Sequence, residues 1–340
     1  MVQNGCNVPV EGRVGVNMRM VCLSLLLALP ALAGEPRLLS FAAGGALLAD
    51  APAVFRSGGL ALAPLEALYA AERAMVQDGD GRLHPVLWVT GEDMDAGVVE
   101  VWVGAQAPVG PDVSSFGSEK MQVSGQAAQM SQAKESGAFG LIARLEGLPA
   151  PGTSGPLHDE HGLFAGWHAT RMVNGQSISF AVPPERLDQM SRTTRQTIAE
   201  WNSRHDSKKE APYLRALGYL WAEDFDGALF YFRQSAEADS SNARAWMHLG
   251  FVEGKVGSAA SRMDCYRKAI EIDPSLAEAH YLLGFSLLMS GDHDGAFQEL
   301  RALRKLDPAF AKRLEIFMKS VHVDVLGEDG KIRHRTQRRL

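Results

Sequence analysis

The feature that most constrains the fold is a period of 34 residues in the last third of the chain. Asp239, Asp273 and Asp307 recur at this interval, and Pro274 and Pro308 directly follow the last two. This period is typical of stacked helix pairs, in which proline ends one unit before the next begins. A small residue in the first helix of a unit would let the second helix approach closely. A large side chain in the second helix would then fill the gap between them. Small residues share the register at Ala216, Gly250 and Gly284, and large ones at Phe232, Tyr266 and Leu300.

The segments Ala245–Gly250, Cys265–Pro274 and Ala279–Gly284 resemble tetratricopeptide (TPR) repeats, a family of modules that hold proteins or peptides. The resemblance implies an all-α solenoid of three units over residues 209–309, about the minimum for a stable array. A capping helix over residues 310–320 would close its end.

Two departures from the repeat pattern are visible. Pro212 stands in the first unit where an aromatic residue is expected. Arg262 replaces the small residue that Ala228 and Ala296 supply at the matching position, which predicts a splayed second helix pair.

The resemblance also implies which side chains line the concave surface, because the first helix of each unit faces it. Aromatic, Met and Arg side chains anchor protein interfaces, so this surface predicts a partner segment with hydrophobic anchors. Alternatively, several of these side chains pack against their neighbours or against the preceding domain. The predicted surface comprises Tyr213, Leu217, Trp221, Arg244, Met247, Phe251, Lys255, Tyr281, Phe285 and Leu288.

Residues 37–187 have a different pattern, with short apolar runs separated by Gly, Pro, Asp and Ser. Many short strands with turn signals predict an all-β sandwich or barrel. Within this region, Leu148–Leu157 resembles the nucleophile loop of trypsin-like serine proteases of the HtrA type, with Ser154 as the nucleophile. The resemblance implies a double β-barrel and extends to Gly59–Leu68 and Asp93–Val99. A generic β-barrel with a chance Gly-Thr-Ser-Gly remains the alternative.

The resemblance places Asp95 at the catalytic aspartate position but Glu66, rather than His, at the position of the base. A base in this chemistry needs a pKa near neutrality, whereas an ordinary Glu has a pKa of about 4.3. Loss of the triad histidine costs on the order of a million-fold in turnover. In addition, Gly155 runs straight into Pro156 without the usual intervening small residue. We therefore expect a catalytically inactive protease fold.

A working serine endopeptidase that uses Ser154 with an unusual base, and recruits substrate through the repeats, is the competing hypothesis. Rescue by another histidine of the region stays open for His168, whereas His84, His158 and His161 are expected at surfaces or edges. His158 and His161 could offer two metal ligands, but no third stands at a recognised spacing, so neither a metal nor a cofactor is expected.

The first 33 residues resemble a secretory signal peptide. Arg19 precedes a short apolar run, and Ala31-Leu-Ala33 forms a cleavage site of small residues, with Met18 as a possible true start. The prediction is a periplasmic or secreted protein, cut near Ala33 and without a stable membrane span. Cys265 would then be the one cysteine of the mature chain, which excludes an intramolecular disulfide.

Charge and composition restrict the kinds of partner that this chain is expected to bind. A net charge of −6 provides no basic field for a phosphate backbone, so nucleic acid is not an expected partner. Residues 188–208 are expected to form a polar linker helix, and residues 321–340 a basic, solvated tail. Together these patterns predict an exported scaffold that binds a protein or peptide partner. The sequence identifies neither the partner nor the oligomeric state.

Overall fold

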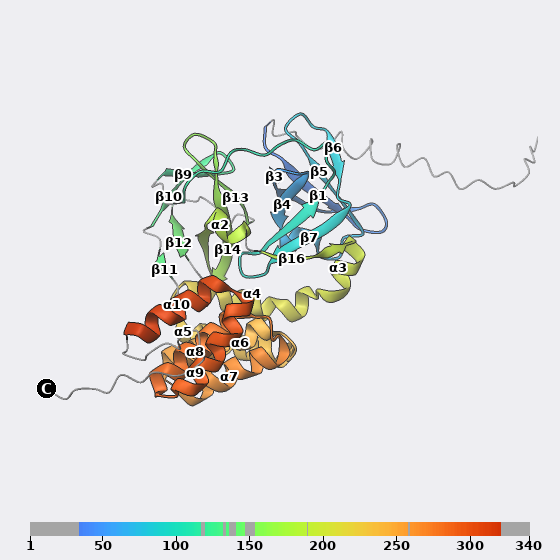
Figure 1. Ribbon diagram of the computed structural model, residues 1–340. Coiled ribbons are helices and arrows are strands. Elements are labelled where there is room, and N and C mark those ends of the chain that lie inside the picture. The colour runs from blue at the N-terminus through green and yellow to red at the C-terminus, as the bar shows by residue number, and fades with distance from the viewer. Residues whose placement is uncertain are drawn as a thin grey trace, which may run out of the picture.

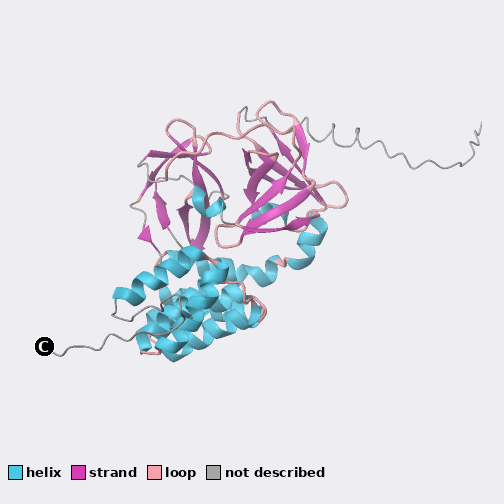
Figure 2. Ribbon diagram, in the orientation of Figure 1, coloured by secondary structure: helices cyan, strands magenta, loops and turns pink. Residues whose placement is uncertain are grey.

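The computed structural model describes residues 34–116, 120–131, 134–135, 141–146, 154–188, 190–257 and 259–320. The predicted signal peptide, with Met18 and Ala33, and the basic tail lie outside these residues. The described chain has two parts, an all-β region followed by a stack of helices, as Figure 2 shows by colour. No described helix has both the length and the apolar character needed to cross a bilayer.

The first half of the β region consists of two sheets around a shared apolar core. A four-stranded sheet has the order β2-β1-β5-β6, and a five-stranded sheet has the order β16-β7-β8-β4-β3. Their core contains Leu38, Leu65, Val99 and Trp201. The strands are β1 (Arg37–Phe41), β2 (Leu47–Pro52), β3 (Val54–Arg56), β4 (Leu60–Pro64), β5 (Arg73–Gln77), β6 (Leu83–Pro85), β7 (Trp88–Asp93), β8 (Val98–Trp102) and β16 (Ser191–Gln196).

The second half is a seven-stranded sheet in the order β10-β9-β13-β14-β15-β12-β11, curled so that β10 also pairs with β12. The all-β region thus contains barrel-like sheets, as the short apolar runs predicted. Asn174 and Gly175 both have positive φ, which suits the two-residue hairpin turn between β14 and β15. The strands are β9 (Lys120–Val123), β10 (Gln126–Met130), β11 (Lys134–Glu135), β12 (Leu141–Glu146), β13 (Gly155–Asp159), β14 (Phe164–Val173) and β15 (Gln176–Val182).

The expected linker helix over residues 188–208 is wrong for most of its length. Residues Ser191–Gln196 form β16, which pairs antiparallel with β7 and extends the β region beyond residue 187. Within this segment Ile198–Arg204 forms a short helix (α3), which starts at a Thr197–Glu200 capping box. The backbone of this segment finds its hydrogen-bond partners on a sheet edge, which its polar sequence did not indicate.

Three antiparallel helix pairs and a final helix follow, in the places that the 34-residue period predicts. Asp224, Asn242 and Asp292 each cap a helix by accepting a bond from a backbone N–H three residues on. The expected capping helix is α10. The helices after α2 (Pro184–Asp188) and α3 are α4 (Ser207–Trp221), α5 (Phe225–Ala238), α6 (Ala243–Val256), α7 (Ala259–Ile272), α8 (Ala277–Ser290), α9 (His293–Leu306) and α10 (Pro308–Ser320).

The small residues of the repeat have the packing role that the sequence predicted. A Cβ added at Gly250 would lie 2.7 Å from the Tyr266 ring and 2.9 Å from the Arg262 carbonyl oxygen. The expected splaying of this pair is therefore wrong. Gly254 provides the space for Arg262, since a Cβ there would lie 2.6 Å from its Cδ.

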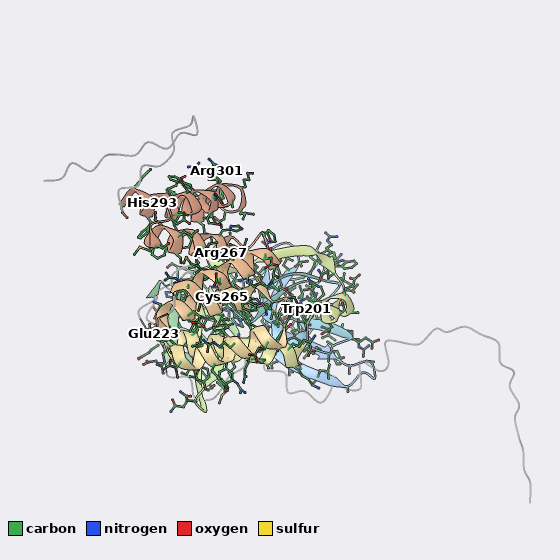
Figure 3. The ribbon with its side chains drawn as sticks, turned by 90° about the horizontal axis from the view of Figure 1, so that it is seen from below. Trp201, Glu223, Cys265, Arg267, His293 and Arg301 are labelled. Carbon is green, nitrogen blue, oxygen red and sulfur yellow. The ribbon has the colours of Figure 1, made fainter. Side chains whose placement is uncertain are left out.

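The helices stack against one side of the β region (Figure 1). Helix α4 lies directly beneath β14, and a single apolar core runs from Ile142 and Phe180 of the second barrel half into the helices. Seen from below, the helices lie in front and the β region behind them (Figure 3). The inner surface of the solenoid thus meets the β region rather than open solvent over part of its length.

Candidate functional site

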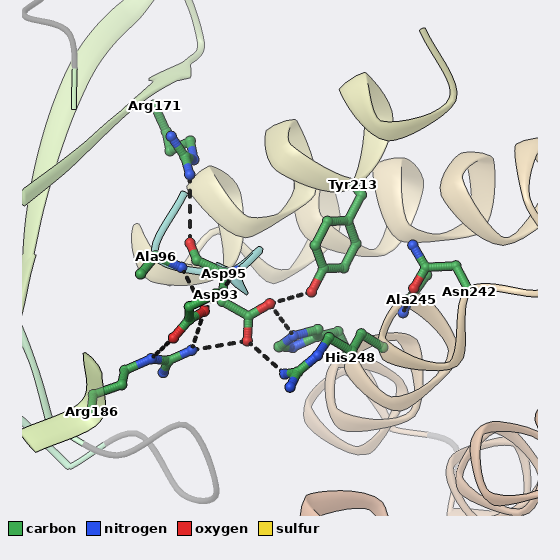
Figure 4. A network of polar contacts seen from close by, with 10 residues as sticks. Asp93, Asp95, Ala96, Arg171, Arg186, Tyr213, Asn242, Ala245 and His248 are labelled. Carbon is green, nitrogen blue, oxygen red and sulfur yellow. Dashed lines mark hydrogen bonds and ion pairs between the residues drawn. The ribbon is translucent and has the colours of Figure 1, made fainter. Parts of the chain in front are cut away.

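The centre of the contact between the two parts is the turn between β7 and β8, residues 94–97, together with Asp93 at the end of β7. Asp93 accepts bonds at 3.0 Å from the backbone N–H groups of Asp95 and Ala96, which fixes the turn. Arg186 from α2 holds the same carboxylate with two bonds of 2.7 and 3.1 Å. The β region alone therefore sets the shape of this turn, and the Asp95 side chain projects from it toward the helices (Figure 4).

Four side chains surround the Asp95 carboxylate, which is only 2% exposed. Tyr213 of α4 donates its hydroxyl to Oδ1, and His248 Nε2 of α6 lies 3.4 Å from the same oxygen. Oδ2 receives Arg186 Nη2 at 3.1 Å and Arg244 Nη1 of α6 at 3.4 Å. A carboxylate has about four acceptor positions, so these donors occupy all of them. Three of the four donors belong to the repeats.

These neighbours decide the charge state of the buried acid. Burial alone would raise the pKa of Asp95, but His248, Arg244 and Arg186 together hold it well below its usual range. Burial and the adjacent Asp95 carboxylate raise the pKa of Tyr213, which keeps its hydroxyl a donor. The inner surface of the first two repeats therefore contains a binding position for an ionised carboxylate.

A second polar cluster joins the parts at the start of α4. His205 Nδ1 lies 2.9 Å from Glu210 Oε1, and His205 Nε2 lies 3.0 Å from Glu92 Oε2 of β7. Trp201 stacks on the His205 ring at 4.1 Å between centroids, and Tyr69 donates to Glu210. Although burial opposes it, the two carboxylates raise the pKa of His205 to about 9.

Apolar contacts complete the junction. The Trp221 ring of α4 meets the Phe180 ring of β15 edge-on at 5.2 Å. Gly218 allows α4 to approach β14 closely, because a Cβ there would lie 2.8 Å from Arg171 Cβ. Apolar burial and charged contacts together fix the helices on the barrel.

The three residues that the protease resemblance assigns to catalysis have different environments. Ser154 directly precedes β13 and is 1% exposed, and its Oγ has no hydrogen-bond partner among the described residues. Glu66 lies exposed on the short helix η1 (Leu65–Leu68). No hydrogen bond joins any two of Ser154, Glu66 and Asp95 within the part of the chain that the structure describes. His168 is buried next to the Ser154 loop, 3.2 Å from where a Gly155 Cβ would stand.

Arg171 of β14 is a functional residue that the sequence analysis missed. It is buried, its Nη2 lies 3.5 Å from the Asp95 carbonyl oxygen, and its charge interacts with both Glu66 and Asp95. Burial lowers its pKa, and the acidic neighbours oppose that shift. The positive charge of Arg171 therefore acts on both Glu66 and Asp95. The sequence sign that could have identified Arg171 is an arginine within an apolar strand, because arginine is rarely buried without a partner.

The predicted partner surface needs correction at four positions. Tyr213, Leu217, Met247 and Leu288 are at most 5% exposed and cannot offer area to a partner. Tyr213 is covered by the β7–β8 turn, whereas Leu217, Met247 and Leu288 belong to the core shared by the helices. Trp221 is partly buried against Phe180.

The other predicted residues form a surface that the β region leaves accessible in part. Lys255 is exposed and lies over the rings of Phe251 and Phe225, 5.3 and 5.7 Å from their centroids. Tyr281 and Phe285 of α8 are half-buried, each against a phenylalanine of α10. We call this set the open inner face, and it comprises Arg244, Phe251, Lys255, Tyr281 and Phe285.

A separate cavity of about 950 Å³ lies between the two halves of the β region. His84, paired with Asp78 at 2.9 Å, and His158 contribute to its lining. Burial lowers the pKa of His158. The described residues contain no group of three His, Cys, Asp or Glu side chains that could hold a metal ion.

Comparison with known proteins bears on the helical part. A family model described as TPR repeat matches residues 263–291, and a Tetratricopeptide repeat model matches residues 243–276. The chain carries TPR repeats. Neither match reaches the β region, and the search of curated proteins found no match.

Solved structures with similar TPR folds each cover about a third of the chain. One is the TPR2B domain of yeast Sti1 in a complex with pHsp70. It is 19% identical over 34% of this chain and 95% of that one, with a TM-score of 0.32. The Arabidopsis OM64 TPR domain is 16% identical over 33% and 95%, with a TM-score of 0.31. A T3SS complex from Aeromonas hydrophila is 22% identical over 36% and 86%, with a TM-score of 0.32.

Proposed function

We propose that this chain is an exported protein-interaction scaffold. Its TPR repeats hold a protein or peptide partner on the open inner face, and its β region is a catalytically inactive relative of trypsin-like serine proteases. The observation that carries the proposal is the full engagement of the Asp95 carboxylate by Tyr213, Arg186, Arg244 and His248. An aspartate in that state has no acceptor position left for orienting a catalytic base.

The other two positions support the same conclusion. A nucleophile must reach the substrate carbonyl, but Ser154 is 1% exposed. At the position of the base, Glu66 presents an exposed carboxyl group where this chemistry uses an imidazole. What the β region does supply is a rigid platform, because its turn, its strand β15 and its residue Glu92 all bind the helices.

The open inner face suits partner binding for chemical reasons. It combines aromatic rings with the positive charges of Arg244 and Lys255, and such residues dominate the binding energy of protein interfaces. We therefore expect the partner to be a segment with apolar anchors and acidic side chains. The signal-like N-terminus supports a periplasmic or secreted location, with cleavage near Ala33.

The proposal is tested by site-specific photo-crosslinking in cells of the source. A photoreactive amino acid is placed at Lys255 or Tyr281, and matched controls are placed at Arg267 of α7 and Arg301 of α9. Both controls are exposed on second helices of their units, and Figure 3 labels them. We expect partner adducts at the first two positions and none at the controls. Equal adducts at all four positions would exclude the inner face as the binding site.

Phe251→Ala and Phe285→Ala provide the matching loss-of-function variants. Each should weaken the crosslink at Lys255 while circular dichroism reports unchanged helical content. Undiminished crosslinking in both variants would also count against the inner face.

A further inference from the structure

The carboxylate position and the open inner face lie along one stripe of helix α6. Arg244, His248, Phe251 and Lys255 are spaced by four, three and four residues, so they share one face of the helix. The β7–β8 turn covers the Arg244 and His248 end of this stripe, whereas Lys255 at the other end is exposed. A single recognition surface is thus half covered by a segment of the same chain.

The polar part of the covering segment is one charged group. Asp93 is held within the β region by Arg186 and by the backbone of its own turn. Met94 packs against the apolar core that includes the helices. It is Asp95 that reaches Tyr213, Arg244 and His248, so the polar groups of the repeats hold this turn through its carboxylate.

We propose that the β7–β8 turn is a built-in competitor, and that the partner of the repeats is an acidic segment whose carboxylate takes the place of Asp95. This inference rests on the proposed function and specifies the partner and the regulation of the same surface. A second carboxylate of the partner would meet Lys255, with an apolar side chain on Phe251 between them.

Helix geometry sets the spacing of the two acids. Arg244 and Lys255 are eleven residues apart on α6, which corresponds to roughly 16 Å at about 1.5 Å per residue. An extended segment advances about 3.3 Å per residue, so the two acidic residues of the partner should be about five residues apart.

Competition explains why one acid alone would not suffice. Because Asp95 is part of the same chain, its effective concentration at the repeats is on the order of millimolar. A partner with a single carboxylate would therefore not displace it. The additional contacts at Phe251 and Lys255 are available only to the partner. The surface thereby selects segments that carry the second acid and the apolar anchor.

The experiment uses the full mature chain and two fluorescein-labelled peptides, Glu-Ser-Phe-Ser-Phe-Glu and its Gln-for-Glu counterpart. Binding is measured by fluorescence polarisation at low salt. We expect Asp95→Asn to bind the Glu peptide at least tenfold more tightly than the unaltered protein, because the competitor has lost its charge. Asp188→Asn, at an exposed ion pair with Arg56, is the matched control and should bind as the unaltered protein does.

Two further results are expected. The tenfold gain should vanish in Asp95→Asn/Arg244→Gln, and the Gln peptide should show no gain in any variant. Equal affinity of the unaltered protein and Asp95→Asn for the Glu peptide would overturn the inference.

A measurement on the unaltered protein tests the inference even if Asp95→Asn fails to fold. Saturation with the Glu peptide should accelerate hydrogen–deuterium exchange in residues 94–97 and slow it in α6. A bound peptide that leaves residues 94–97 protected would overturn the competition. If Lys255 crosslinks a partner but Asp95→Asn changes no affinity, the proposed function stands and only this inference fails.

Discussion

The helical and β regions of this molecule differ in how far their stabilising contacts reach along the sequence. In the repeats, Gly250 packs on Tyr266 of the next helix, sixteen residues on. In the β region, β16 pairs with β7 about a hundred residues earlier, and the Asp95 carboxylate binds His248 more than 150 residues later. Contacts between residues close in sequence produce a regular sequence period. Contacts between distant residues produce no period, and their only sequence sign is an isolated residue whose type is unusual for its position.

This contrast has a functional meaning. In the proposed function, the repeats supply the binding surface, and the β region restricts it by covering one end. The residues that join the two regions are charged and buried, so their pairing is costly to break on one side only. The junction, rather than either region, is the part of the molecule most sensitive to single substitutions.

The largest effect is expected from Asp95→Ala. The substitution leaves Arg244, Arg186 and the Tyr213 hydroxyl buried without their common acceptor, and the loss from breaking a buried ion pair is about 3–5 kcal/mol. Because the first half of the β region has a core separate from that of the helices, we expect one denaturant transition to separate into two, monitored by tryptophan fluorescence and far-UV circular dichroism. Exposed Asp188→Ala is the control, and an unchanged single transition in Asp95→Ala would contradict the assigned role.

A smaller effect, of about 2 kcal/mol, is expected from raising the pH. The pKa of His205 is raised to about 9 in the folded protein from 6.5, so its contribution is complete below pH 6.5 and is lost as the pH rises through 9. Unfolding free energies between pH 6 and pH 10 measure it. His205→Gln should flatten this dependence, and an equally steep fall in that variant would assign the titration to another group.

Gly250→Ala tests the local packing of the repeats. The added methyl group would lie 2.7 Å from Tyr266, and overpacking of this kind costs about 1–2 kcal/mol. Gly44→Ala is the matched control, because nothing lies within 4 Å of its added Cβ. Urea unfolding followed at 222 nm compares the two, and equal midpoints would show that the second helix pair is looser than its contacts indicate.

The fold of the repeats was predictable to within a few residues because its signals repeat. The small positions followed from the period, and the resemblance to TPR repeats implied the three units over residues 209–309 and the capping helix. The predicted partner surface was less accurate, since the sequence of α4 does not reveal that β14 and the β7–β8 turn cover Tyr213 and that Leu217 is core.

In the β region, the all-β character of residues 37–187 was predictable, but the strand partners and the last strand, β16, were not. Ser191–Gln196 has no apolar alternation, so β16 could be found only from the free edge of β7. The protease resemblance singled out Asp95 for a catalytic position and not for a contact with the repeats, because its four neighbours come from three other elements. Arg171, Arg186 and His248 each look ordinary until the chain brings them to Asp95, where Arg171 meets the carbonyl oxygen and the other two meet the carboxylate.

The smallest effect is expected from Ser154→Ala. The buried Ser154 hydroxyl has no hydrogen-bond partner among the described residues, so its removal should change stability by less than about 1 kcal/mol. A fluorophosphonate probe should label neither the unaltered protein nor the variant, because Glu66 and the occupied Asp95 carboxylate do not activate the serine. Labelling of the unaltered protein that disappears in Ser154→Ala would establish the serine as a nucleophile. In that case the β region would be an enzyme regulated by its repeats, and Asp95 would have to exchange its helical partners for a catalytic base during each turnover.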